Sequence, residues 1–122
     1  MAASGLRGVL APMYRSARWY TANGHVVEYE WDEKAGEKAM AEAMAVLDEA
    51  AAHPSGRLTG MVAPSQIDTC TPGLIQASFE EASRRDLPFQ IHAAQSIVEF
   101  HEITRRNGMT PVEWLQSLGV LS

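Results

Sequence analysis

The sequence predicts an α/β fold of about three parallel strands with their helices. Short apolar runs alternate along the chain with longer segments in which apolar residues recur at helical spacing. Strands that alternate with helices pair in parallel, because each helix carries the chain back to the start of the next strand. We therefore expect a single domain, which suits the length of 122 residues.

Composition and charge limit the partners that the chain could bind. Hydrophobic residues make up 46% of the chain and charged residues 20%, which is typical of a globular domain. The formal net charge is −5 and Lys and Arg form no run, so we expect no binding to nucleic acid. No apolar run approaches the roughly 20 residues that cross a bilayer, so we expect a cytoplasmic protein without membrane contact. Cys70 is the only cysteine, which excludes an intrachain disulfide.

The first quarter of the chain combines a strand with a long polar excursion. The apolar run 6–11 predicts a strand, which Pro12 ends. The segment 13–32 is rich in aromatic residues and arginine, and its turn signal would allow a small hairpin. Such an excursion is typical of a loop that faces substrate, and equally of a flap that packs on a second copy of the chain. On the first interpretation, the substrate-binding residues are Tyr14, Arg15 and Trp19.

Two helices and a strand come next. The segment 35–52 is rich in Ala, Glu and Met, and its apolar residues recur at helical spacing, which predicts a helix. Residues 58–63 form the next strand candidate. Thr71 and Pro72 are a typical helix start, and we expect this helix over 72–85.

The stretch after this helix contains the strongest single candidate for a functional side chain. Residues 89–94 alternate between two faces and predict a strand, with His92 near its carboxyl end. Ligands and catalytic groups collect at the carboxyl ends of parallel strands, so His92 could be a ligand; the alternative is a half-buried structural histidine. Ser96 starts a helix expected over 97–107, and a last helix is expected over 111–118.

Three motifs stand in this second half of the chain. A strand ends in His92 and two small residues, a Gly-Met-Thr-Pro turn occupies 108–111, and Gly-Val-Leu occupies 119–121. Together they resemble the amidohydrolase superfamily, in its branch of guanine and cytosine deaminase-like enzymes and triazine-type chlorohydrolases. The resemblance covers most of the chain and is most specific over 88–121. The strands upstream would match the third and fourth strands of the family's barrel.

The resemblance implies a fold and an activity. The fold is a (β/α)8 barrel, of which residues 1–122 would form a single partial domain. The activity is metal-dependent hydrolysis of a small-molecule substrate such as a heterocycle, at a carbon–nitrogen bond other than a peptide bond or at a carbon–chlorine bond. His92 matches the family's histidine that ends the fifth strand and binds zinc or iron. A bound ion would lower the pKa of a water molecule towards about 7 and make hydroxide available for attack.

Two departures from the family pattern affect this interpretation. Three positions after the histidine the family commonly has a glutamate that moves protons, whereas this chain has Gln95. A carboxamide has no titratable proton, so Gln95 could orient substrate or water in the catalytic site but could not act as general acid or base. The family's other metal ligands are a His-x-His motif, a histidine on the sixth strand and an aspartate on the eighth. They have no counterpart in this sequence, and a catalytic zinc takes about three protein ligands.

We therefore expect a fragment of a metal-dependent amidohydrolase that has little or no activity on its own. The rival interpretation is a non-catalytic α/β module that binds a partner or forms a homo-oligomer through open strand edges. Substitution of His92 separates the two, because only a hydrolase would lose metal.

Overall fold

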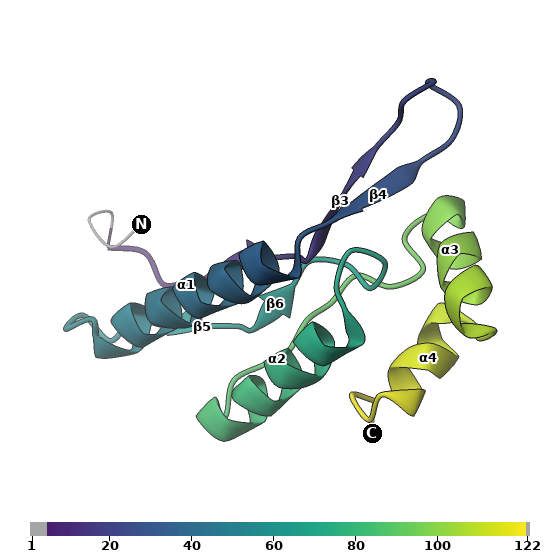
Figure 1. The fold of residues 1–122 in the computed structure, drawn as a ribbon. Coiled ribbons are helices and arrows are strands. Elements are labelled where there is room, and N and C mark those ends of the chain that lie inside the picture. Colours follow the sequence, from purple (N-terminus) through teal and green to yellow (C-terminus); the bar gives the residue numbers. More distant parts are fainter. Residues whose placement is uncertain (1–4, 122) are drawn as a thin grey trace.

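The computed structural model describes residues 5–121, which form short strands and helices (Figure 1). The elements in chain order are β1 (Gly8–Leu10), β2 (Met13–Tyr14), β3 (Ala17–Tyr20), β4 (Glu28–Trp31), α1 (Glu33–Ala52), β5 (Leu58–Gly60), β6 (Ala63–Pro64), α2 (Pro72–Arg85), α3 (Ile97–Asn107) and α4 (Pro111–Ser117).

The parallel strands are short and interrupted. β1 pairs in parallel with β5, and β2 pairs in parallel with β6. The run expected over 6–11 contains β1, and Pro12, which has no N–H to donate, lies between it and β2. β5 and the start of β6 occupy the strand expected over 58–63.

The segment 89–94, expected as a strand, is not one in the structure. It makes two isolated parallel bridges, between Val62 and Phe89 and between Gln66 and His92. Pro64 lies between these bridges and offers no N–H to a carbonyl of the facing segment, so the ladder is interrupted there. The two bridges are four residues apart along 62–66 but three residues apart along 89–92. The extra residue in the first segment forms a bulge in the pairing.

Each helix begins after a side chain that accepts a hydrogen bond from a backbone N–H of the first turn. These caps are Asp32, Thr71, Ser96 and Thr110. Because Asp32 is the cap, α1 begins at Glu33, before the expected range 35–52. α2 and α3 occupy 72–85 and 97–107, and α4 ends at Ser117, one residue before the expected end of the helix.

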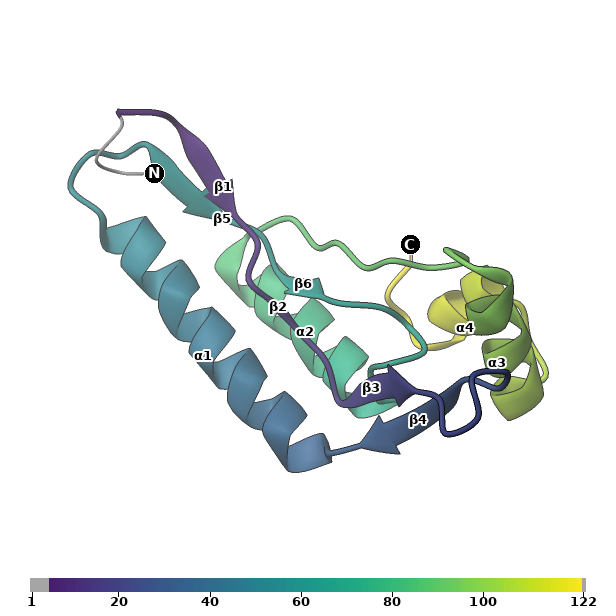
Figure 2. The same cartoon turned by 90° about the horizontal axis from the view of Figure 1, so that it is seen from above.

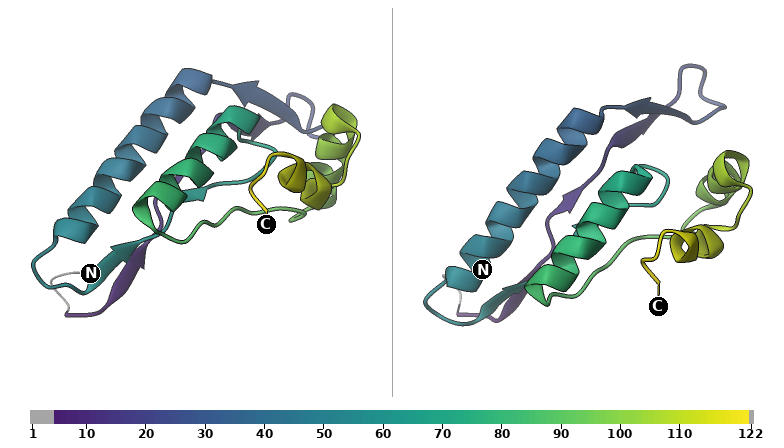
Figure 3. Two further views of the ribbon diagram at one scale, coloured as in Figure 1. Left: turned by 90° about the horizontal axis from the view of Figure 1, so that it is seen from below. Right: turned by 60° about the horizontal axis from the view of Figure 1, so that its bottom comes forward.

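The helices α1 and α2 pack on one face of the strand layer. Figure 3 views this face, with α1 and α2 side by side, and Figure 2 views the layer from the other side, with α2 behind β2 and β6. The core between the two layers includes Leu47, Val62 and Ile75. On the other face Val9 of β1 and Met13 of β2 are 55% and 52% exposed. Figure 2 shows no described helix over β1 and β2 on this side. The strand layer of residues 5–121 is therefore covered on one face.

The excursion after β2 forms an antiparallel hairpin of β3 and β4, which extends towards α3 (Figure 1). Trp19 and Tyr29 are directly opposite in its register, so their side chains lie on the same face. Among residues 5–121 no helix has both the length and the apolar character needed to span a membrane.

Candidate functional site at the carboxyl edge of the strands

Three chain segments meet where the parallel strands end. Ser65, just after β6, donates its N–H to the carbonyl of Tyr14 at 2.9 Å. The carbonyl of Ser65 accepts from the N–H of His92 at 3.3 Å, and the carbonyl of His92 accepts from the N–H of Ile67 at 3.1 Å. These bonds fix the backbone of His92 beside Ser65 at the carboxyl edge of the layer.

His92 lies on the face of its segment that points away from the helices. Phe89, Ile91 and Ala93 pack against the hydrophobic core. Because side chains of an extended segment alternate, Gln90 and His92 belong to the opposite face, where Gln90 is exposed and His92 half-buried. The expected metal ligand is thus on the open side of the strand layer.

Gln95 contacts the loop after β6. Its Oε1 accepts a hydrogen bond from Nε2 of Gln66 at 2.8 Å. Gln66 is buried and is paired with His92 in the isolated bridge whose hydrogen bonds Ser65 and Ile67 make, whereas Gln95 is exposed. The structure therefore brings His92, the predicted metal ligand, and Gln95, the predicted catalytic carboxamide, to the same loop. Gln66 of this loop is paired with both of them.

Glu99 holds the turn that connects His92 to α3. Its carboxylate accepts hydrogen bonds from the N–H groups of Ala94 at 2.7 Å and Gln95 at 2.8 Å, and the residue is 1% exposed. Burial raises the pKa of Glu99, and the neighbouring charge of Asp68 adds to the shift. A glutamate three residues after a cap such as Ser96 signals a helix start, but the sequence gives no sign that this carboxylate is buried beneath the turn.

The hairpin is attached to the site through Asp68, a residue that sequence reasoning missed. Oδ2 of Asp68 accepts hydrogen bonds from the indole Nε1 of Trp19 and from the hydroxyl of Tyr29, both at 2.8 Å. Trp19, a predicted substrate-binding residue, is 42% exposed beyond this contact. No local signal could have identified Asp68, because its partners are 49 and 39 residues away in the chain.

The other predicted substrate-binding residues lie elsewhere. The side chain of Tyr14 is 3% exposed in the core and donates a hydrogen bond to Oγ of Ser78 on α2 at 2.6 Å. Burial raises the pKa of the Tyr14 phenol to about 12. A side chain enclosed between the strands and α2 has no surface to offer a substrate, so the structure does not favour the predicted role of Tyr14.

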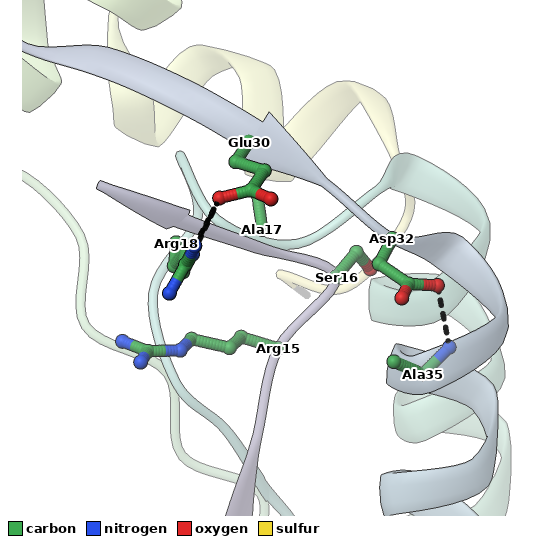
Figure 4. A pocket seen from close by; sticks show the side chains of 7 residues that line it. All are labelled: Arg15, Ser16, Ala17, Arg18, Glu30, Asp32 and Ala35. Atoms are coloured by element: carbon green, nitrogen blue, oxygen red, sulfur yellow. Dashed lines mark hydrogen bonds and ion pairs between the residues drawn. The ribbon is translucent and has the colours of Figure 1, made fainter. Parts of the chain in front are cut away.

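Arg15 is exposed and lines a pocket of about 350 Å³ beside the base of the hairpin (Figure 4). In Figure 4 its guanidinium points away from Asp32, while the neighbouring Arg18 is bonded to Glu30 at 2.6 Å. Arg15 and Trp19 are therefore both exposed near the hairpin. Arg15 lines the pocket at the base of the hairpin, whereas Trp19 is bonded to Asp68.

Residues 5–121 contain no group of three His, Cys, Asp or Glu side chains placed to hold a metal ion. His92 is a suitable nitrogen ligand, but a catalytic zinc takes about three protein ligands. The described residues alone thus do not fit a complete catalytic metal centre.

No protein-family model matches the chain. Among curated proteins, it is similar to the 5-methylthioadenosine/S-adenosylhomocysteine deaminase of Carboxydothermus hydrogenoformans, with 34% identity over 89 residues that are 73% of this chain and 21% of that protein. It is also similar to the 5'-deoxyadenosine deaminase of Methanothermobacter thermautotrophicus, with 35% identity over 65 residues that are 53% of this chain and 15% of that protein. The chain spans about a fifth or less of the length of these relatives.

Two solved structures have a similar fold over nearly the whole chain. An adenosine deaminase from Xanthomonas campestris with bound zinc superposes with a TM-score of 0.75 at 17% identity, covering 99% of this chain and 25% of that chain. A triazine hydrolase from Arthrobacter aurescens superposes with a TM-score of 0.74 at 16% identity, covering 99% of this chain and 26% of that one. Together with the deaminase relatives they confirm the resemblance to the amidohydrolase superfamily that is seen in the sequence.

Proposed function

We propose that this chain supplies the third to fifth strand units of a (β/α)8 amidohydrolase that acts on a small heterocyclic substrate. The reaction is hydrolytic removal of an amino group from a ring carbon, as in the deaminases that the chain resembles, or of chloride from such a carbon. The deaminase names of the relatives make the carbon–nitrogen bond the first choice.

The observation that carries this proposal is the one-sided covering of the strand layer. Parallel sheets are normally buried on both faces, yet here Val9 and Met13 are more than half exposed on the face opposite α1 and α2. His92 belongs to that same face, at the carboxyl edge. In a closed barrel this face is the interior, where apolar side chains are buried and ligands from several strands converge at the mouth.

His92 is, in this proposal, one ligand of a divalent metal, and the other ligands come from outside residues 5–121. A neutral imidazole suits zinc and iron alike. We propose zinc, because the similar adenosine deaminase structure contains it.

Gln95 is proposed to orient the substrate or the attacking water. Its Oε1 is bonded to Gln66, and its Nε2 has no acceptor among residues 5–121, so it can donate to a ligand oxygen or ring nitrogen. Because a carboxamide is not a general acid or base near neutral pH, the proton carrier is another group. Arg15 and Trp19 are proposed to contact the substrate from the side of the hairpin; Tyr14 is not, since it is enclosed in the core.

The test compares the polypeptide that the intact gene encodes with the isolated 122-residue chain. Release of ammonia from aminated purines and pyrimidines, and of chloride from a chlorinated triazine, is measured for both. We expect hydrolysis by the gene product and little or none by the isolated chain. Tight zinc binding together with hydrolysis at enzymic rates by the isolated chain would overturn the proposal. A gene product that hydrolyses none of these substrates, and whose metal content is unchanged by His92→Ala, would instead support the non-catalytic module.

A further inference from the structure

The hairpin of β3 and β4 is tied to the rest of the molecule through one buried carboxylate. Asp68 is 0% exposed, and its Oδ2 accepts from both Trp19 and Tyr29 at 2.8 Å. These two residues face each other across the hairpin, so a single oxygen atom is bonded to both strands. A rigid attachment of this kind distinguishes the hairpin from a free surface loop.

Arg106 of α3 contacts the same group of residues. Its guanidinium lies 4.7 Å from the ring centroid of Tyr29 and 4.9 Å from that of Trp31, and Nη1 donates to the backbone carbonyl of Asp68 at 2.9 Å. Its Nε is bonded to Glu102 at 2.7 Å, which fixes the side chain in this position. The cation thus stacks on the hairpin while remaining bonded to the segment that carries Asp68.

The burial of the Asp68 carboxylate costs free energy, which a role in packing alone would not explain. Its Oδ1 is buried and has no hydrogen-bond partner among the described residues, and Glu99 is a second buried carboxylate nearby. A buried carboxylate needs hydrogen-bond donors to offset the loss of its hydration. The donors here are the indole of Trp19 and the hydroxyl of Tyr29, so the function of Asp68 is best sought in the hairpin.

Asp68 also connects the hairpin to the candidate site through a short stretch of chain. Ile67, its neighbour, donates its N–H to the carbonyl of His92, and Gln66 is bonded to Gln95. The base of the hairpin is joined to the same loop, since the N–H groups of Ser16 and Ala17 donate to the carbonyl of Thr69 at 2.8 and 2.9 Å.

We propose that Asp68 is a positioning residue, which fixes the hairpin, and with it the indole of Trp19, beside the carboxyl edge where His92 and Gln95 lie. The hairpin then forms a fixed wall of the substrate site. The effect on substrate binding rests on the proposed function, whereas the attachment itself does not depend on it.

The attachment is tested in the 122-residue chain by hydrogen exchange of the Trp19 indole N–H, whose NMR signal is assigned with Trp19→Phe. Asp68→Ala should accelerate this exchange by about tenfold or more, because the acceptor is lost. Asp68→Asn keeps one oxygen that can accept from both donors and should stay within about threefold of the unmodified chain. Glu30→Gln removes the exposed pair with Arg18 on the same hairpin and serves as the control, with no change expected.

A second variant covers the case in which Asp68→Ala fails to fold. Tyr29→Phe removes one of the two donors and keeps the ring under Arg106, so it should change the chemical shift of the Trp19 indole proton and accelerate its exchange. An exchange rate that is unchanged in Tyr29→Phe, or in a folded Asp68→Ala, would overturn the proposal.

The consequence for substrate is tested in the intact gene product. Asp68→Ala should raise KM by about tenfold with its zinc content unchanged, and Asp68→Asn should restore most of the loss. An unchanged KM would show that the hairpin, even if fixed by Asp68, does not position substrate. If the gene product proves inactive on every substrate, the proposed function fails, and the exchange measurement still decides the role of Asp68.

Discussion

The carboxylate of Glu99 reaches back over its own helix cap and accepts the N–H of Ala94 at 2.7 Å, in a turn where Ala94 has the left-handed φ of 57°. A non-glycine residue in this region is strained, and it persists where surrounding bonds determine the conformation. The bonds from Glu99 therefore define the path of the chain between His92 and α3.

Glu99→Ala should destabilise the chain by about 2 to 3 kcal/mol, because two backbone N–H groups lose their acceptor in a partly buried turn. The change in the free energy of unfolding is measured by urea denaturation. Glu80→Ala, at an exposed position of α2, is the control and should stay within about 0.5 kcal/mol. Equal effects of the two substitutions would show that the Glu99 contacts contribute nothing to stability.

The stability contribution of Glu99 should depend on pH with a definite sign. Since burial raises its pKa above the ordinary 4.5, the folded chain binds the proton more tightly than the unfolded chain does. The contribution from protonation is then fully present below about pH 4.5 and is lost as the pH rises through the raised pKa. The difference in free energy of unfolding between the unmodified chain and Glu99→Gln should accordingly fall with rising pH, which urea titrations at several pH values would measure. A difference that grows over this range would mean that the pKa of Glu99 is lowered instead.

Tyr14 and Ser78 should show an energetic coupling of about 1 kcal/mol, the usual contribution of a buried hydrogen bond. Tyr14→Phe, Ser78→Ala and the double variant give this value as a double-mutant cycle in urea. If Tyr14 were a substrate-binding residue instead, Tyr14→Phe would leave stability unchanged and would alter KM in the intact gene product.

Gly60→Ala should destabilise the chain by about 1 to 3 kcal/mol, because the added Cβ would overlap Cδ2 of Leu47, a buried side chain of α1. Gly73→Ala is the matched control, since a Cβ there meets no atom within 4 Å and alanine favours the helix. Thermal unfolding that ranks the two variants equally would contradict the close packing of α1 on β5.

The helices could be predicted closely because their signals are local. Each cap accepts a hydrogen bond from a backbone N–H three residues ahead, as Thr71, Ser96 and Thr110 do. The sequence shows the glutamates that pair with Ser96 and Thr110, and Pro72 marks the helix start after Thr71. The alternation of strands and helices likewise indicates parallel pairing.

The interruption at 89–94 could not be predicted in the same way. It depends on Pro64, which lies on the facing segment and has no N–H to donate to residues 89–94. The sequence of 89–94 itself gives no sign of an interruption. The enclosure of Tyr14 and the attachment of Trp19 to Asp68 depend equally on partners far along the chain. Of the candidate site, the sequence therefore indicates His92 and Gln95, and the tertiary structure is needed to find Asp68 and the buried position of Glu99.

The most direct test of the account is the zinc content of the intact gene product, measured by mass spectrometry for the unmodified protein, His92→Ala and His101→Ala. His101 is the matched control, because it is an exposed histidine of α3 that lies outside the carboxyl edge. We predict that His92→Ala loses most of its bound zinc while His101→Ala retains it. Zinc retained by His92→Ala at the level of the unmodified protein would contradict the assignment of His92 as a metal ligand.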